Sequence, residues 1–280
     1  MNLQQLNNTY DRAELVYRLV WQLDKTGCMN FGYCQHARCD MVTATRNLLL
    51  AVAREARVAD HHHVLDAGSG YGGNATMLAQ HFGCHVTGVT GSERQCRKAA
   101  AYSERQKTGP LTRFVQADYH QMPFTRHTFD RIISIEAIFH SQDKATFFRE
   151  AWRVLKPGGH MVFTDYVFPQ NTLQGLQDWV KGYYIGQRHS LEQLLAGLQA
   201  CGFAVTGTRN LSAGIIMSSA RLYRLGKICQ ILLSPFTLLP GGLQKWLPVK
   251  PVQAKGAVQQ YTALKSEKWQ YFLVSVRKPA

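Results

Sequence analysis

The sequence predicts an α/β fold with a doubly wound, mostly parallel sheet. An apolar run at 63–67 leads into the glycine-rich turn "GSGYGG" and then into a helix-like segment. Six further strand-like runs follow, and helix-like segments separate most of them. Alternation of strand and helix is typical of parallel strands, and such sheets bind ligands at the carboxyl ends of their strands.

Each element is predicted from its local pattern. The seven strands are expected at 63–67, 85–90, 112–117, 129–136, 160–168, 204–211 and 271–278. Helices are expected at 74–81, 92–107, 144–155 and 190–203. The last of these begins at a serine, has leucines at helical spacing and ends at a glycine. The segment "KPGG" at 156–159 is expected to form a turn before the fifth strand.

The length of 280 residues suits one large domain over 1–280. Within it we expect a helical N-terminal segment over 1–60 and a core over 60–168. A helical insert over 169–250, interrupted by the strand near 203–211, is expected to face the substrate. Residues 251–280 are expected to supply the final helix and strand.

The glycine turn fits two nucleotide-binding patterns. Gly68, Gly70 and Gly73 satisfy the dinucleotide spacing G-x-G-x-x-G, whereas Gly68, Gly70 and Gly72 satisfy G-x-G-x-G. Asp66 decides between them, because a carboxylate at the strand end would repel the phosphates of NAD. It would attract the ammonium group of S-adenosylmethionine, which has no phosphate. The turn therefore favours S-adenosylmethionine.

The remaining composition argues against other classes of site. Seven cysteines without a C-x-x-C pattern indicate free thiols, and the triplet at 61–63 precedes a strand, where adjacent side chains diverge. No metal is therefore expected. The N-terminal sequence has no secretory pattern, and the longest apolar run, 228–239, is too short to cross a bilayer.

Four segments in order resemble the class I S-adenosylmethionine-dependent methyltransferases. They are "VLDAGSG" at 64–70, "VTGVTGSERQ" at 86–95, "QADYHQMPF" at 116–124, and "FDRIISIEAIFH" with "RVLKPGGHMVFTDY" between 129 and 166. "GCMNFGYC" upstream and the C-terminal "YTALKSEKWQYFLVSVRKP" resemble the small-molecule branch, which includes tocopherol, sterol and natural-product methyltransferases. The resemblance implies a Rossmann-like methyltransferase fold.

The resemblance implies a set of cofactor contacts. They are Tyr33, Asp66, Gly68, Ser69, Gly70, Thr90, Gln95, Asp118, Tyr119 and Ile135. Thr90 stands where the superfamily usually has an acid for the ribose, and Gln95 is expected to reach the ribose instead. Asp118 is expected to accept the adenine amino group, and its alternative role is that of a turn residue.

The resemblance also places catalytic and acceptor residues. His140 and Glu136 follow the fourth strand, and His140 is either a general base or a structural residue of the loop. Glu136 is expected to orient a neighbour or the cofactor. The substrate-binding candidates are Phe31, Phe139, Asp165 and Tyr184. The segment around Phe31 and Tyr33 is either a lid over the cofactor or ordinary packing.

Basic residues concentrate toward the C-terminus. The segment 210–280 holds ten Lys or Arg residues against one acid, Glu267, in a chain of net charge +14. Together with the apolar run this charge suits a membrane surface or an anionic, lipophilic acceptor. Solvated charge without a partner is the alternative, and no nucleic-acid motif is present. The expected location is cytoplasmic, with or without peripheral membrane contact.

Two functions remain open at this stage. The first is methylation of a small, largely apolar acceptor, such as a natural product, isoprenoid or lipid-like molecule. A base at His140 favours O-methylation slightly over C- or N-methylation. The second is a non-catalytic, cofactor-binding or membrane-associated protein with the same fold. The intact cofactor motif favours the enzyme, and the sequence does not indicate an oligomeric state.

Overall fold

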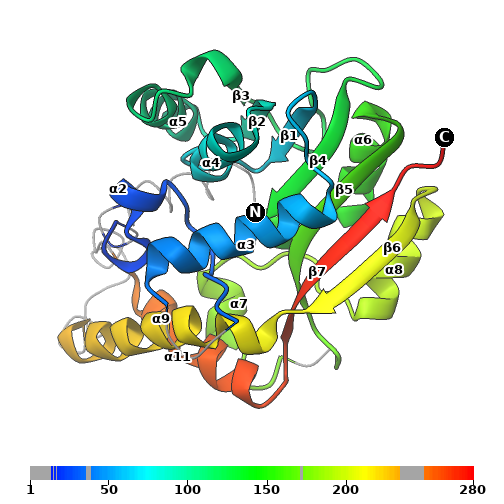
Figure 1. Ribbon diagram of the computed structural model, residues 1–280. Coiled ribbons are helices and arrows are strands. Elements are labelled where there is room, and N and C mark those ends of the chain that lie inside the picture. The colour runs from blue at the N-terminus through cyan, green and yellow to red at the C-terminus, as the bar shows by residue number, and fades with distance from the viewer. Residues whose placement is uncertain (1–13, 15, 17, 36–38, 171–172, 234–248) are drawn as a thin grey trace.

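Seven strands form one sheet in the order β3-β2-β1-β4-β5-β7-β6 in this computed structural model (Figure 1). The described residues are 14, 16, 18–35, 39–170, 173–233 and 249–280. β7 runs antiparallel to β5 and β6, whereas the other neighbouring pairs are parallel. The predicted doubly wound, mostly parallel sheet is confirmed.

The strands lie close to their predicted positions. They are β1 His63–Ala67, β2 His85–Thr90, β3 Thr112–Gln116, β4 Phe129–Ile135, β5 Leu155–Val167, β6 Ala204–Asn210 and β7 Gln270–Arg277. β5 differs from the prediction, because the segment 156–159 belongs to the strand. Gly158, at φ 74°, and a register shift opposite β4 absorb this segment as a bulge, so it forms no separate turn.

The helices cover both faces of the sheet and one end of it. They are α2 Leu23–Thr26, α3 Met41–Glu55, α4 Gly73–Phe82, α5 Glu93–Arg105, α6 Lys144–Val154, α7 Gln177–Gly182, α8 Leu191–Ala200, α9 Ser212–Leu233 and α11 Pro251–Lys265, with 3₁₀ turns η1 Gly109–Leu111 and η2 Ile138–His140. Ser92 and Ser190 accept backbone hydrogen bonds at the starts of α5 and α8, as N-caps do. Figure 1 shows α9 beside α11, with α7 next to them.

Two apolar cores lie on opposite faces of the sheet. Val64 of β1 and Val162 of β5 pack in the core that includes α3 and α4. Leu65 and Phe163, one residue further along each strand, pack in the core that includes α6 and α8. Because successive strand side chains point to opposite faces, this alternation fixes which face each polar residue of β1, β4 and β5 joins.

The chain reverses its direction of travel across the sheet at β1 and β4. From β1 it moves outward through β2 to β3, and it then returns to β4 on the other side of β1. At such a switch point the loops after the two strands separate and leave room for a ligand. Asp66 lies at the end of β1, and Glu136 directly follows β4.

The cysteine prediction is wrong at one pair. Cys34 and Cys39 form a disulfide, with their Cα atoms 6.2 Å apart, whereas Cys28, Cys84, Cys96, Cys201 and Cys229 are free thiols. The five-residue separation of these cysteines does not by itself indicate that they pair.

None of the helices in the described part of the chain combines the length and the apolar character that a bilayer crossing needs. The apolar run predicted to contact a membrane extends into residues 234–248, which lie outside the described ones.

Candidate active site

The turn after β1 requires glycine for two separate reasons. Gly68, Gly70 and Gly72 have φ values of 94°, 52° and 82°, which L-residues with a side chain rarely adopt. In addition, a Cβ on Gly68 would lie 2.1 Å from the Cβ of Ala137, at the end of β4. The turn is therefore shaped both by its backbone conformation and by the close approach of the β4 loop.

The turn is also attached to β2. The backbone N–H groups of Gly68 and Ser69 both donate to the carbonyl of Val89, at 2.9 and 2.8 Å. These two N–H groups are consequently occupied within the protein. The position of the turn is fixed by the sheet, so a ligand does not have to order it.

Several buried polar atoms at this turn lack a partner among the described residues. They are both carboxylate oxygens of Asp66, the hydroxyl of Ser69 and the hydroxyl of Thr76. Asp66 is only 1% exposed. Burial raises the pKa of its carboxyl to about 7, and the nearby Ala75 backbone N–H opposes the rise without reaching hydrogen-bond geometry. Leaving such groups unsatisfied is costly, so this cluster is suited to a polar, cationic ligand.

The N-terminal segment 27–31 lies over the turn. The carbonyl of Gly27 accepts the backbone N–H of Gly73 at 3.0 Å, and the thiol of Cys28 donates to Asn74 Oδ1 at 3.3 Å. The methyl of Met29 lies 3.5 Å from the position of a Cβ on Gly70. The segment predicted as a lid therefore contacts the glycine turn directly, through residues that sequence reasoning had not singled out.

The predicted ribose residues bind each other. The hydroxyl of Thr90, at the end of β2, donates to Gln95 Oε1 at 2.7 Å, and both side chains are buried. Gln95 sits in the first turn of α5, where its backbone N–H donates to Ser92 Oγ at 3.3 Å. The pair is thus positioned beside the turn after β1 by the capped start of α5.

Asp118 and Tyr119 follow β3. The carboxylate of Asp118 accepts the backbone N–H of His120 at 2.8 Å, and its contact with the imidazole Nδ1 at 2.7 Å lowers the pKa of this carboxyl. His120 Nε2 lies 2.7 Å from the hydroxyl of Ser141, which connects this loop to the one after β4. Tyr119 donates to the carbonyl of Ala137 at 3.4 Å. Sequence reasoning missed the role of His120, although a His two residues after an Asp is a spacing at which the two side chains can contact each other in a turn.

Glu136 joins three distant parts of the chain. Its Oε1 accepts the backbone N–H of Phe31 at 2.7 Å and the hydroxyl of Tyr271 at 2.8 Å, and its Oε2 accepts the hydroxyl of Tyr166 at 3.0 Å. Burial raises the pKa of this carboxyl to about 7, against these hydrogen bonds. The φ of 50° at Glu136 is a strained conformation for a residue with a side chain. Ile135, just before it, is buried on the same face as Asp66.

An aromatic cluster surrounds this carboxylate. Phe31 lies 6.3 Å from Tyr166 and 6.1 Å from Trp269, measured between ring centroids, and Phe139 stacks on Tyr166 at 4.6 Å. Trp179 adds a further wall, 4.6 Å from Trp269. Two of the predicted acceptor residues, Phe31 and Phe139, therefore lie in one cluster with residues of α7 and of the segment between α11 and β7.

His140 is half-buried beside the cluster. Its Nδ1 lies 3.0 Å from the carbonyl of Tyr184, and because a carbonyl only accepts, Nδ1 carries the proton in the neutral ring. Nε2 is then the basic nitrogen. Burial lowers the pKa of this imidazole to about 4, so the ring is neutral near pH 7. The predicted residue Tyr184 contributes its backbone carbonyl to this arrangement.

Two predicted site residues lie elsewhere. The carboxylate of Asp165 forms a buried ion pair with Lys144 of α6, because alternation along β5 turns it to the face opposite Tyr166. The Tyr33 ring packs against Gly214 of α9, where a Cβ would lie 2.2 Å from it. The structure therefore does not bring Asp165 to the aromatic cluster, nor Tyr33 to the glycine turn. In the described ranges, no group of three His, Cys, Asp or Glu side chains is arranged to hold a metal.

Known proteins share both the sequence motifs and the fold. Residues 65–163 match the family model described as "Methyltransferase domain". A sterol 24-C-methyltransferase of Gibberella zeae is 32% identical over 219 residues, which cover 73% of this chain and 54% of that protein. Residues 65–163 therefore form a domain of this methyltransferase family. The methyltransferase family that was inferred from the sequence is thereby confirmed for these residues.

Solved structures of this methyltransferase fold cover the whole chain. The cyclopropane synthase of Mycobacterium tuberculosis superposes with a TM-score of 0.82 at 16% identity, over 99% of both chains. A [4+2]-cyclase superposes with a TM-score of 0.80 at 22% identity, over 100% of this chain and 97% of the other. These likenesses establish the fold. The chain spans about half the length of the sterol methyltransferase that it matches.

Proposed function

We propose that the protein transfers the methyl group of S-adenosylmethionine to a small, largely apolar acceptor. The observation that carries this proposal is the buried Asp66 carboxylate, whose oxygens have no partner among the described residues. It lies at the end of β1, beside a turn that only glycine can build. A cationic ligand would compensate the cost of burying this carboxylate, whereas the phosphates of a dinucleotide would increase it.

Asp66 holds the ammonium group of the cofactor in this proposal, and the hydroxyls of Ser69 and Thr76 bind its carboxylate. Thr90 and Gln95, which are hydrogen-bonded to each other, bind the ribose hydroxyls with their side chains. Asp118 accepts the adenine amino group, with Tyr119 beside it. The bound cofactor supplies an electrophilic methyl group on a sulfonium. The segment 27–31 then closes the site against water.

The acceptor binds against the edge of the aromatic cluster that contains Phe31, Phe139 and Tyr166. Holding an acceptor atom in line with the methyl carbon supplies most of the rate in such a displacement. Glu136 is a positioning residue, since its oxygens already accept three hydrogen bonds that fix the lid and two tyrosines. His140, neutral and basic at Nε2, removes the proton of an acceptor hydroxyl. This arrangement favours O-methylation, although the curated relatives include C- and N-methyltransferases by name.

The test supplies isotopically labelled S-adenosylmethionine together with a panel of apolar alcohols, phenols, amines and alkenes. Mass spectrometry identifies the labelled product, and NMR identifies the methylated atom. Label on an oxygen, lost in His140→Ala, supports the proposed base. Label on carbon or nitrogen with equal rates in His140→Ala would overturn the role of His140 and leave the transfer itself intact.

We also propose peripheral contact with an anionic bilayer through the end of α9. Ile228, Ile231 and Leu232 are 52%, 73% and 66% exposed, and they share one side of the helix with the exposed Arg224. α9 contains no acidic residue. On such a surface the cations can bind anionic lipid headgroups while the exposed apolar side chains enter the acyl region of the bilayer.

Sedimentation with vesicles of phosphatidylserine and phosphatidylcholine tests this contact. Binding should weaken with added salt, and Leu232→Glu should reduce it several-fold, since it removes apolar contact and adds repulsion. Leu173→Glu, at an apolar residue 40% exposed outside α9, is the matched control and should bind as the wild type does. Equal binding of both variants, or no binding at low salt, would contradict the proposal.

A further inference from the structure

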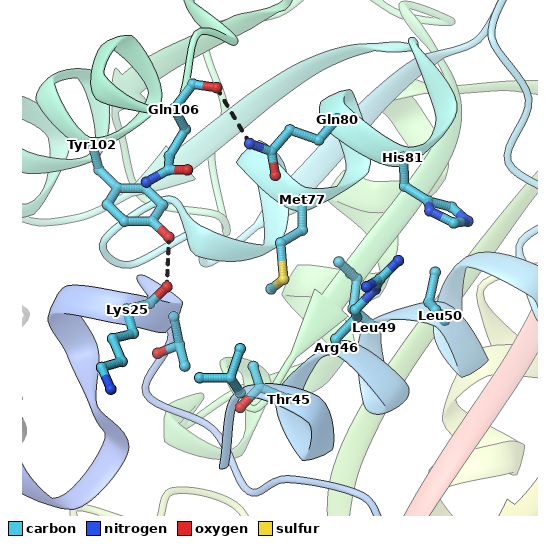
Figure 2. Close-up of a pocket in the computed structure, with 12 residues that line it drawn as sticks. Lys25, Thr45, Arg46, Leu49, Leu50, Met77, Gln80, His81, Tyr102 and Gln106 are labelled. Atoms are coloured by element: carbon cyan, nitrogen blue, oxygen red, sulfur yellow. Dashed lines mark hydrogen bonds between the residues drawn. The ribbon is translucent and has the colours of Figure 1, made fainter. Parts of the chain in front are cut away.

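A cavity of about 320 Å³ lies between α3 on one side and α4 and α5 on the other. Figure 2 shows residues of α3, including Thr45, Arg46 and Leu49, facing Met77 of α4 and Tyr102 of α5. None of the residues around Asp66, Glu136 or His140 lines this cavity. It is therefore separate from the site of the proposed methyl transfer.

The walls of the cavity are mainly apolar. Leu49 is 1% exposed, and Leu50, Met77 and Val42 complete the apolar lining along α3 and α4. The α3 residues of this lining recur at helical spacing, so they form a stripe along one side of the helix. A ligand in the cavity would bury an extended apolar body against this stripe.

The hydroxyls in the lining and the amide of Gln80 are used within the protein. The hydroxyl of Tyr102 donates to the carbonyl of Lys25 at 3.1 Å, and the hydroxyl of Thr45 donates to the carbonyl of Met41 at 2.8 Å. The amide of Gln80 donates to the carbonyl of Gln106 at 3.2 Å. Figure 2 shows the bonds of Tyr102 and Gln80 as dashed lines at the border of the space.

The guanidinium of Arg46, an exposed residue, has no hydrogen-bond or ion-pair partner in the part of the chain that the structure describes. It projects from α3 toward the α4 side of the cavity in Figure 2, where His81 also lies. Lys25 lies at the border, and no Asp or Glu lines the cavity. A guanidinium in this setting binds carboxylate or phosphate through two parallel hydrogen bonds.

The cavity shares a wall with the segment that covers the glycine turn. Thr26 and Lys25 line it, and the next residue, Gly27, accepts the backbone N–H of Gly73. The Tyr102 ring closes on Gly27 as well, since a Cβ there would lie 2.8 Å from that ring. A ligand that holds Tyr102 and the 25–27 segment in place therefore stabilises the cover over the cofactor site.

The geometry points to a binding site for an amphipathic anion at this cavity, with its carboxylate or phosphate on Arg46 and its apolar body along the α3 stripe. Occupancy raises the affinity of the separate site for S-adenosylhomocysteine, and by linkage S-adenosylhomocysteine raises the affinity for the anion by the same factor. The site is a regulatory one, distinct from the acceptor cluster.

Calorimetry on the full chain with decanoate and with decyl phosphate, each below its micelle-forming concentration, tests the site. Saturable one-to-one binding is expected, about fivefold or more weaker in Arg46→Gln, because the paired cation is lost. Arg54→Gln removes an equal charge from the same helix outside this cavity and should bind as the wild type does. Phe139→Ala, in the acceptor cluster, should also leave the binding unchanged. The stronger of the two probes identifies the preferred head group, carboxylate or phosphate.

Three results would overturn the inference. One is the absence of saturable binding for both anions, and another is equal weakening by Arg46→Gln and Arg54→Gln. The third is an affinity for S-adenosylhomocysteine that saturating decanoate leaves unchanged, where an increase of about threefold or more is expected. The first two measurements do not depend on the proposed methyl transfer, so failure of that proposal would leave them interpretable.

Discussion

The affinity for S-adenosylhomocysteine should rise with pH as Asp66 ionises. With a pKa of about 7, the carboxyl is about 3% ionised at pH 5.5 and half ionised at pH 7. If only the carboxylate holds the ammonium group, affinity increases about 15-fold over this interval, or about 1.6 kcal/mol. The interval lies below the range in which α-amino groups lose their proton.

Isothermal titration calorimetry at several pH values between 5.5 and 7 measures this slope. Asp66→Asn should bind more weakly and without the slope. Glu136→Gln is the matched control, because the Glu136 carboxyl also has a pKa raised to about 7 but already accepts three protein hydrogen bonds. The Cys28 thiol nearby stays protonated, since burial raises its pKa well above the usual value. A flat profile in the wild type, or an equal slope in Asp66→Asn, would refute the assignment.

The remaining predictions concern the base, the turn and the buried ion pair. His140→Ala should lower turnover about 100-fold or more, with cofactor affinity within about twofold. With saturating cofactor, so that ionisation of Asp66 does not limit binding, the wild-type rate should fall only near pH 4, and a decline near pH 6.5 would contradict the lowered pKa of His140. Gly68→Ala should lower the free energy of unfolding by about 2 kcal/mol or more, because of the φ of 94° at this position and the clash with Ala137. Calorimetry measures this loss, and an unchanged melting temperature would contradict the tight turn. Lys144→Met should lower the free energy of unfolding in denaturant by about 3–5 kcal/mol, because it leaves the buried Asp165 carboxylate without its ion-pair partner. The double variant Lys144→Met, Asp165→Leu should recover most of this loss. Equal stability of the single and double variants would contradict the cost of the unpaired charge.

Local sequence patterns were sufficient to predict the glycine turn and the strands, apart from the first residues of β5. Asp66 and Gly68 are two positions apart in the chain and lie at the same turn, so a short motif reveals them. The capped start of α5 was equally visible from Ser92. In each case the residues that determine the structure lie within a few positions of one another.

Long-range contacts were not predictable in the same way. Tyr271 and Phe31 reach Glu136 across 135 and 105 residues, and no local pattern indicates that they share one carboxylate. Asp165 was assigned to the acceptor site from the family resemblance, but the side-chain alternation of β5 turns it toward Lys144. Its orientation depends on the register of the whole sheet, which the motif does not contain.

Shared fold does not determine the reaction, since a [4+2]-cyclase superposes on the whole chain. The distinction between methyl transfer and such a reaction therefore rests on whether the methyl group leaves the sulfonium. Binding of S-adenosylmethionine at Asp66 would be expected whether or not the methyl group is transferred, so binding alone does not distinguish the two reactions.

The most direct measurement follows the label of methyl-labelled S-adenosylmethionine in a cell extract that contains apolar acceptors. With the wild-type protein, label should appear in an organic-phase product together with a stoichiometric amount of S-adenosylhomocysteine, and Asp66→Ala should abolish both. Tight binding of S-adenosylmethionine without any labelled product, or an acceptor converted without gaining the label, would contradict the proposed methyl transfer.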